Sequence, residues 1–275
     1  MNTQKLDQLL SNTGDLALRR RAALILRSMN ATPKDRILDV GCGDGFYLFL
    51  LDKLGTYEKL LGIDNNPSSI AAAKKLVPAK SVQIVVGDIL KSGFPKESFS
   101  KILCSEVVEH LPNDVAGLVA MHRLLRKGGT LYITVPHINY PPFWDPINWI
   151  LQHWFGTHIR SGLWAGIWNM HDRLYMMNQI TGAIQKAGFI VEDKQYLTHY
   201  ALPFNHIIAY IGFRLRTSKT LGKSVRNSMS KFHPTTKKTW FSYVMEFLVW
   251  LDKRNDRTFG PNTSTVSLFV KARKP

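Results

Sequence analysis

Short apolar runs alternate with helix-like stretches between residues 36 and 136, and this alternation predicts the fold. Each run is of a length and composition typical of a buried strand, and a stretch with helical spacing of apolar residues follows it. Strands and helices in strict alternation indicate βαβ units, which form a parallel sheet with helices on both faces. The expected strands are RILDVG, KLLGID, VQIVVGD, KILCSE and TLYITVP. We therefore expect an α/β protein with a doubly wound sheet.

The segments around this alternation predict further elements. An imperfect apolar stripe over the first 30 residues predicts helix, although three consecutive arginines at 19–21 interrupt it. A helix-like stretch ends at Gly188, which is a favourable residue just beyond a helix. FIVEDKQYL and STVSLFVKARK then predict two more strands. We expect a single domain over residues 1–275, which includes a tryptophan-rich lid at 137–170 and an insertion at 199–262 between strands six and seven.

The insertion combines two apolar stretches with a basic connection. Residues 201–213 and 240–251 are apolar but too short to cross a bilayer. Between them, 214–239 carries eight lysines and arginines and no acidic residue, which is half of the net charge of +16. This composition is typical of a helical hairpin on an anionic membrane surface. Packing in the core or at a homodimer interface is the second interpretation. Nucleic acid is the least favoured partner, because aliphatic runs bracket the basic residues.

The net charge of +16 does not change the expected fold, but it implies attraction to an anionic partner. Cys42 and Cys104 lie in apolar, strand-like surroundings, which argues against a disulfide framework and favours a reducing compartment. The first residues lack the basic-then-apolar pattern of a secretion signal. The sequence therefore predicts a cytoplasmic protein, peripheral on the membrane if the insertion lies on lipid.

A glycine-rich turn supplies the first candidate for a ligand site. In residues 37–51, an apolar strand leads into glycines at every second position and then into an apolar helix. Such a turn lets the backbone approach a ligand and directs a helix N-terminus toward it. The spacing G-x-G-x-G differs from the G-x-G-x-x-G of dinucleotide-binding proteins. Asp64 and Asp88 end the next two strands, where carboxylates are suited to accept hydrogen bonds from ribose and adenine.

This ordered set resembles the class I S-adenosylmethionine (SAM)-dependent methyltransferases, in the group with D-V-G-C-G-x-G, G-I-D and G-D segments. The resemblance is close over residues 36–136 and looser over 171–197 and 264–273. It implies a Rossmann-like, mostly parallel seven-stranded sheet with an antiparallel last strand, and SAM as the methyl donor. It also implies that the methionine part of SAM contacts Asp39, Gly41, Cys42, Gly43 and Gly45, the ribose Asp64 and Asn65, and the adenine Asp88 and Ile89, with Ser105 beneath the ligand. The alternative is an unrelated α/β protein in which these carboxylates are solvated strand ends.

The segment CSEVVEHL follows the fourth strand and supplies candidates for the reacting end of the site. If it is helical from Glu106, then Glu106, Glu109 and His110 share one face. Two carboxylates and an imidazole suit a divalent cation such as Mg²⁺. The segment resembles E-x-x-E-H in ubiquinone-pathway O-methyltransferases and small-RNA 2′-O-methyltransferases, which implies that His171 completes the site. Alternatively, His110 is a general base or positions the substrate, while Glu109 only packs and His171 only anchors the lid.

These features predict an enzyme that transfers a methyl group from SAM to oxygen of a small lipid-like or glycan-type acceptor at a membrane surface. The aromatic lid suits such an acceptor, and tryptophan also favours the membrane interface. The alternatives are an RNA methyltransferase that uses the basic insertion, and a non-catalytic SAM-binding scaffold. The lid holds five of the seven tryptophans: Trp144, Trp149, Trp154, Trp164 and Trp168.

Overall fold

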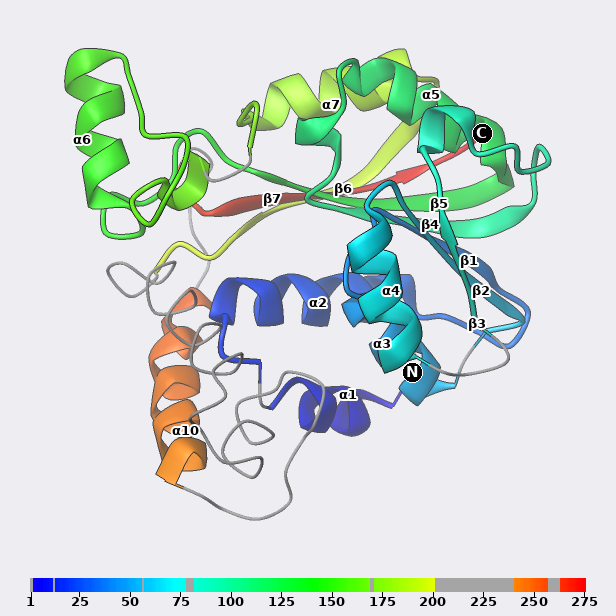
Figure 1. Ribbon diagram of the computed structural model, residues 1–275, viewed down its shortest axis with the longest axis horizontal. Helices are drawn as coiled ribbons and strands as arrows, with labels where there is room; N and C mark the ends of the chain where they lie inside the picture. The colour runs from blue at the N-terminus through cyan, green and yellow to red at the C-terminus, as the bar shows by residue number, and fades with distance from the viewer. Residues whose placement is uncertain are drawn as a thin grey trace.

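Seven strands form one mixed sheet in the computed structural model of the chain, in the order β3-β2-β1-β4-β5-β7-β6 (Figure 1). Only β7 runs antiparallel to its neighbours, β5 and β6, which confirms the expected fold class. The structure describes residues 2–11, 13–55, 57–77, 82–168, 171–200, 240–256 and 263–275. The strands are β1 (Arg36–Val40), β2 (Lys59–Asp64), β3 (Val82–Val86), β4 (Phe99–Ser105), β5 (Leu125–Pro136), β6 (Ile190–Leu197) and β7 (Ser267–Arg273).

The burial of each strand follows its place in the sheet. The central strands β1, β2 and β4 are nearly continuous apolar runs because helices cover both of their faces. The edge strand β6 instead alternates exposed and half-buried residues over most of its length. The five parallel strands β3, β2, β1, β4 and β5 end at a common edge, where the candidate site lies.

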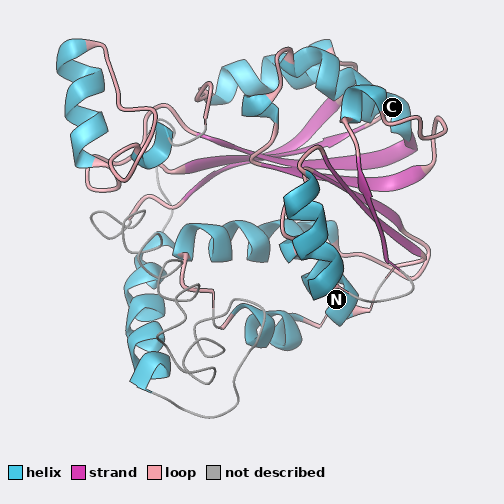
Figure 2. Cartoon of the chain, viewed as in Figure 1, coloured by secondary structure: helices cyan, strands magenta, loops and turns pink. Residues whose placement is uncertain are grey.

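Helices cover the sheet in two layers (Figures 1 and 2). On one face lie α1 (Thr3–Leu10), α2 (Leu16–Met29), α3 (Phe46–Leu54) and α4 (Pro67–Leu76), which share an apolar core with β1 and β2. On the other lie α5 (Asp114–Leu124) and α7 (Met177–Lys186). The stripe over the first 30 residues thus forms two helices, and the carboxylate of Asp15 begins the second by accepting the Leu18 N–H at 3.1 Å.

The lid forms helix α6 (Pro146–Phe155) and the 3₁₀ turn η3 (Gly166–Trp168), which project at one end of the molecule (Figure 1). Its five tryptophans divide into two groups. Trp144 and Trp168 are buried in a small separate apolar cluster, with Trp149 packed against it. Trp154 and Trp164 are exposed. Packing therefore explains three of the five.

The insertion leaves the sheet after Leu197 and returns at Ser267, two residues that are paired between β6 and β7. The apolar stretch 240–251 forms helix α10 (Trp240–Asp252), followed by the 3₁₀ turn η4 (Lys253–Asp256). The stretch 201–213 and the basic connection 214–239 lie outside the described residues. Over the described ranges, no helix combines the length and the apolar character needed to cross a bilayer.

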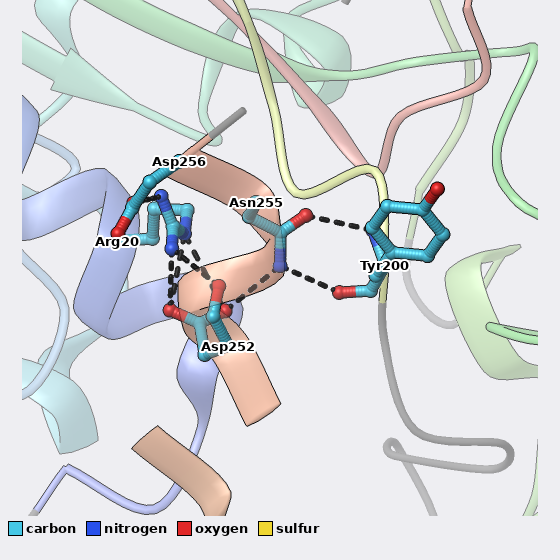
Figure 3. A network of polar contacts seen from close by, with 5 residues as sticks. All are labelled: Arg20, Tyr200, Asp252, Asn255 and Asp256. Atoms are coloured by element: carbon cyan, nitrogen blue, oxygen red, sulfur yellow. Dashed lines mark hydrogen bonds and ion pairs between the residues drawn. The ribbon is translucent and has the colours of Figure 1, made fainter. Parts of the chain in front are cut away.

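A network of polar contacts attaches α10 to the body of the protein (Figure 3). Arg20 of α2 donates to the Asp252 carboxylate from two of its nitrogens, at 2.7 and 3.1 Å, and to Asp256 at 2.7 Å. Asn255 pairs with both the N–H and the carbonyl of Tyr200, at 2.7 and 2.8 Å. The end of α10 is thus tied both to α2 and to the chain just beyond β6.

Candidate active site

A cavity of about 550 Å³ opens at the carboxyl ends of β1, β2 and β4. The strand order reverses between β1 and β4, and ligands of doubly wound sheets bind at such a reversal. Of the residues expected to hold SAM, five line this cavity: Gly41, Asp64, Asn65, Asp88 and Ile89. Of those expected at the reacting end, Glu106, His110 and His171 line it as well. The two ends of the predicted site therefore share one cavity.

The glycine turn between β1 and α3 requires glycine for close approach. Gly41 has φ +66°, and a Cβ there would lie 2.3 Å from a methyl carbon of Val107. Gly45 has φ +85°, and its Cβ would lie 3.0 Å from that of Ala73 in α4. L-residues rarely adopt these backbone angles, and neither position leaves room for a side chain. The turn therefore brings backbone directly against the cavity wall.

Asp64 fixes this turn from the neighbouring strand. Its Oδ2 accepts the Gly43 N–H at 2.9 Å, and its Oδ1 accepts the Asn66 N–H at 2.8 Å. Asn66 in turn caps α4 by accepting the Ser68 N–H at 2.9 Å. Each carboxylate oxygen has a second lone pair, so Asp64 retains acceptor capacity toward a ligand in the cavity.

The other expected SAM contacts are not among the residues that line the cavity. Asp39 is buried, and its Oδ2 has no hydrogen-bond partner among the described residues. Burial, and secondly the charge of Asp64, raise the pKa of Asp39 well above its usual range. The side chain of Cys42 packs inward against Gly62. Ser105 lies between Tyr47 and Thr134, with oxygen–oxygen distances of 3.1 and 2.9 Å. Gly43 and Gly45 likewise contribute no lining.

The segment is not helical from Glu106, so the condition for Glu106, Glu109 and His110 to share one helical face is not met. β4 continues to Ser105, Glu106 has φ +55°, and helical structure begins only at Val108, as the single 3₁₀ turn η2 (Val108–His110). Positive φ turns the chain at Glu106, so its side chain does not share a helical face with Glu109 and His110. Its carboxylate instead pairs with Arg21, at 3.1 Å from Oε2 to Nη1.

Arg21 is the main site residue that the sequence did not reveal. It interrupts the apolar stripe of α2, and the structure directs it inward, where it also donates to the Ser267 hydroxyl at 3.1 Å. Burial alone would lower the pKa of Arg21, but neighbouring anionic groups, Glu106 foremost, raise it above its usual value. Both Arg21 Nε and Glu106 Oε1 are buried without a hydrogen-bond partner among the described residues. A charged pair with spare polar atoms thus borders the cavity.

Glu109, His110 and His171 converge beside this pair. Oε1 of Glu109 lies 3.8 Å from Nε2 of His110 and 3.6 Å from Nε2 of His171. Neither carboxylate oxygen of Glu109 has a hydrogen-bond partner among the described residues. Burial, and then the charge of Glu106, raise the pKa of Glu109 well above its usual range. These three side chains are close enough together to hold one metal ion.

Two backbone contacts hold the histidines in this arrangement. Nδ1 of His171 contacts the Ile167 carbonyl, an acceptor only, so Nδ1 carries the proton and Nε2 faces Glu109. Arg173 donates to the Leu111 carbonyl at 2.7 Å, which ties the segment carrying His171 to the turn carrying His110. None of the five lid tryptophans, all within the described ranges, lines the cavity.

Part of the chain resembles known methyltransferases in sequence. A family model described as "Methyltransferase domain" matches residues 38–133. The chain is 30% identical over 112 residues to 2-methyl-6-phytyl-1,4-hydroquinone methyltransferase of Arabidopsis thaliana, which covers 41% of this chain and 32% of that protein. It is 33% identical over 109 residues to ubiquinone biosynthesis O-methyltransferase of Xanthomonas campestris, which covers 38% of this chain and 44% of that protein. These matches span about a third to a half of the relatives' own lengths.

Solved structures share the fold over nearly the whole chain. A methyltransferase of unassigned substrate from Bacillus halodurans superposes with a TM-score of 0.55 at 16% identity, over 92% of this chain and 98% of the other. Phosphoethanolamine N-methyltransferase 2 of Haemonchus contortus, solved with SAM, does so with a TM-score of 0.55 at 19% identity, over 93% of this chain and 52% of the other. The fold and the site define a class I methyltransferase architecture. Residues 38–133 therefore form a methyltransferase domain, and the described sheet around them has the fold of the class I SAM-dependent methyltransferases.

Proposed function

We propose that this protein transfers a methyl group from SAM to oxygen of a small lipid-like or glycan-type acceptor at a membrane surface. The observation that carries the proposal is one cavity lined both by the SAM-type residues Gly41, Asp64 and Asp88 and by Glu106, His110 and His171. The relative named as an O-methyltransferase supports an oxygen acceptor, and the relative named for a phytyl-bearing hydroquinone supports a lipid-like one. The membrane component of the proposal rests on the acid-free basic composition of 214–239.

The residues present suit SAM. Such a ligand needs a backbone turn free of Cβ atoms, as at Gly41, and carboxylate acceptors, as at Asp64 and Asp88. A buried oxygen of Asp39 also has no hydrogen-bond partner within the part of the chain that the structure describes. Asp64 would hold the ribose, and Asp88 with Ile89 the adenine. When bound, SAM supplies an electrophilic methyl carbon attached to sulfur. The chain's own task is then to bind, to orient the acceptor oxygen and to exclude water, since proximity dominates methyl transfer.

The cofactor part of the proposal is tested by calorimetry. Wild-type protein should bind SAM, and Asp64→Ala should weaken binding at least tenfold, because the ribose hydroxyls and the Gly43 N–H both lose their acceptor. Glu97→Ala, a carboxylate far from the cavity lining, is the matched control and should bind normally. Failure of the wild type to bind either SAM or its demethylated product would remove the basis of the proposal.

We further propose a divalent cation at Glu109, His110 and His171. The Glu109 carboxylate, which accepts no hydrogen bond from the described residues, and two imidazoles fit a metal. Because Glu106 pairs with Arg21, this set of donors is richer in nitrogen than we expected. Such donors suit a first-row transition ion such as Zn²⁺ better than Mg²⁺. A bound ion would lower the pKa of an acceptor hydroxyl. Without metal, His110 would take the role of base or positioning group.

Metal analysis separates these roles. The protein, dialysed against Zn²⁺ or Mg²⁺ in turn, should retain about one equivalent of metal, and Glu109→Gln should lower metal affinity at least tenfold while leaving SAM binding intact. Retention of neither ion would favour His110 acting alone.

The acceptor class is tested with radiolabelled SAM and fractionated cell extract. Label in the fraction extracted by organic solvent, lost with Asp64→Ala, is the expected result. Label in RNA would refute the acceptor class but not methyl transfer. SAM binding without transfer to any fraction would favour a non-catalytic scaffold.

A further inference from the structure

Helix α6 of the lid has polar residues on its inward side and large apolar residues on its exposed side. A surface helix of a water-soluble protein normally turns apolar residues inward and polar residues outward. In α6 the inward positions include Asn148, which is fully buried, and Gln152, whose Oε1 accepts from Tyr140 at 3.4 Å and Trp168 at 3.3 Å. The outward positions include Ile150 and Trp154, four residues apart and both exposed. The outer face of α6 is therefore built for an apolar environment.

Further exposed apolar residues lie in the lid before and after the helix. Phe155 ends α6 and is 69% exposed, while Trp154 beside it is 73% exposed. Leu163 and Trp164 are also exposed, and their segment lies against the helix because Asn148 donates to the Trp164 carbonyl at 2.9 Å. We refer to Phe143, Ile150, Trp154, Phe155, Leu163 and Trp164 as the lid patch. So many large apolar side chains exposed within one short segment form a concentration that water-soluble surfaces rarely carry without a partner.

The patch is held outward by a buried polar brace. Oδ2 of Asp145 accepts from Asn148 Nδ2 at 2.7 Å and from the Ile167 N–H at 3.1 Å. Oδ1 of Asn148 accepts the Ile159 N–H at 2.7 Å. A Cβ on Gly166 would overlap the Asp145 carboxylate, so the chain passes directly over it. Because these hydrogen bonds satisfy the polar groups that occupy this part of the lid interior, the exposed aromatic side chains do not replace them there.

The charges around the patch are those of a surface that meets anions. Residues 146–168 contain no aspartate or glutamate, while Arg160 and His153 are exposed among them. The whole chain carries +16. Two copies of so basic a protein repel each other, which disfavours self-association through this face, whereas an anionic bilayer attracts it. Tryptophan and phenylalanine beside arginine form a combination suited to the boundary between lipid headgroups and acyl chains.

We propose that the lid patch is the element that inserts into the surface of an anionic membrane, with Trp154 and Phe155 penetrating furthest. This inference rests on the proposed function in one respect: a lipid-like acceptor would come from a membrane, so we choose a lipid surface as the partner of the patch. It assigns membrane contact to α6 rather than to the basic insertion alone. α10 lies at the same end of the molecule as α6, so both elements are able to face one bilayer (Figure 1).

The first test is co-sedimentation of the full-length protein with vesicles. Wild type should bind phosphatidylcholine vesicles that contain roughly 30% phosphatidylglycerol at least tenfold more tightly than vesicles of phosphatidylcholine alone, because the basic surface is attracted to anionic lipid. Trp154→Ser combined with Phe155→Ser should weaken that binding at least tenfold. Val119→Ser on α5 is the matched control, because Val119 is an exposed apolar residue outside the lid, and it should bind as wild type does. Calorimetry with SAM on the same variants checks that the cavity is intact.

A second measurement follows insertion directly. Both native cysteines are buried, so Trp154→Cys provides a selective site for an environment-sensitive fluorophore. Its emission should shift to the blue when anionic vesicles are added, and that of the same dye at Val119→Cys should not.

Three results would overturn the inference. The first is a wild type that binds no vesicle, whatever its affinity for SAM. The second is undiminished binding by the Trp154/Phe155 double variant. The third is a dimer in sedimentation that the double variant dissociates, which would identify a second copy as the occupant of the patch. A protein that binds vesicles through the patch but never binds SAM would leave this inference standing and remove the proposed function.

Discussion

Gly41 carries two separate constraints, and a second glycine allows them to be measured apart. Gly41 and Gly93 have nearly the same backbone angle, with φ of +66° and +67°. A Cβ at Gly93 meets no described atom within 4 Å, while one at Gly41 meets Val107 at 2.3 Å. A side chain at Gly41 would therefore cause both backbone strain and a steric clash, and a side chain at Gly93 would cause backbone strain alone.

We predict that Gly93→Ala lowers the free energy of unfolding by about 1 kcal/mol, the penalty of a left-handed L-residue. Gly41→Ala should lower it by about 2–4 kcal/mol, because Val107 or the turn must also move, and should weaken SAM binding. Urea denaturation and calorimetry measure the two effects. Equal losses for the two variants would show that the Val107 contact relaxes freely.

His137 supplies a prediction about pH. It is almost fully buried, and burial lowers its pKa to about 4. The unfolded chain binds a proton near pH 6.5 and the folded chain only near pH 4, so protonation favours unfolding in that window. Above pH 6.5, His137 is neutral in both states and does not reduce the free energy of unfolding. As the pH falls from 6.5 toward 4, the free energy of unfolding decreases by roughly 3 kcal/mol, because only the unfolded chain binds the proton.

The difference between wild type and His137→Gln isolates this contribution from other titrating groups. The stability of wild type, from urea denaturation at a series of pH values, should fall more steeply than that of the variant between about pH 6.5 and 4. Parallel curves would mean that His137 is protonated in the folded protein without penalty.

At the scale of elements, Arg20 of α2 binds two aspartates that follow one another closely at the end of α10, and the two ion pairs can be compared. Asp252 and Asp256 both bind Arg20 at 2.7 Å, but their side chains are 14% and 65% exposed. A partly buried, doubly hydrogen-bonded ion pair contributes more than an exposed one, which water and salt screen.

We predict that Asp252→Ala lowers the protection of the α10 amides by about 1–3 kcal/mol, and Asp256→Ala by less than about 1 kcal/mol. Hydrogen exchange, resolved over residues 240–252, is the measurement. Asp252 also accepts from Asn255 at 3.0 Å, so part of its larger effect passes through Asn255. A reversed order of the two variants would show that α10 is held elsewhere.

The sequence predicted elements well where a local pattern determines them. The apolar runs and the glycine turn identified the parallel strands and the acidic strand ends, and the family resemblance implied the antiparallel last strand. The helical spacing of Glu106, Glu109 and His110 did not predict the structure at Glu106. Its positive φ accompanies an ion pair with Arg21, and a local pattern cannot reveal a partner so distant in the sequence. Arg20 and Arg21 show the same limit: both interrupt one apolar stripe, yet one binds α10 outside the core and the other Glu106 inside it.

On the scale of the whole molecule, the insertion begins and ends at neighbouring positions of two paired strands, β6 and β7. Leu197 and Ser267 are paired in the sheet, and the Val266 N–H donates to the Thr198 carbonyl at 3.0 Å. A short Gly/Ser linker in place of residues 201–256 therefore spans the gap without altering either strand.

We predict that this deletion variant folds and binds SAM, with stability lowered by the few kcal/mol that the Arg20 contacts contribute. Near-ultraviolet circular dichroism and calorimetry measure both properties. Restoring 240–256 behind the linker should recover part of the stability, which distinguishes loss of these contacts from a general defect. A deletion variant that stays unfolded would show that the insertion belongs to the core.

The place of β7 between β5 and β6 also has a consequence for the order in which the protein is made. β6 has no hydrogen-bonded neighbour in the sheet of described strands except β7, which follows it after about 70 residues of chain. At roughly 5–20 residues per second, a ribosome needs several seconds to synthesise that interval. During this time β5 presents an open edge and β6 has no partner, so the nascent chain is most exposed to mispairing and to chaperones while the insertion is being translated.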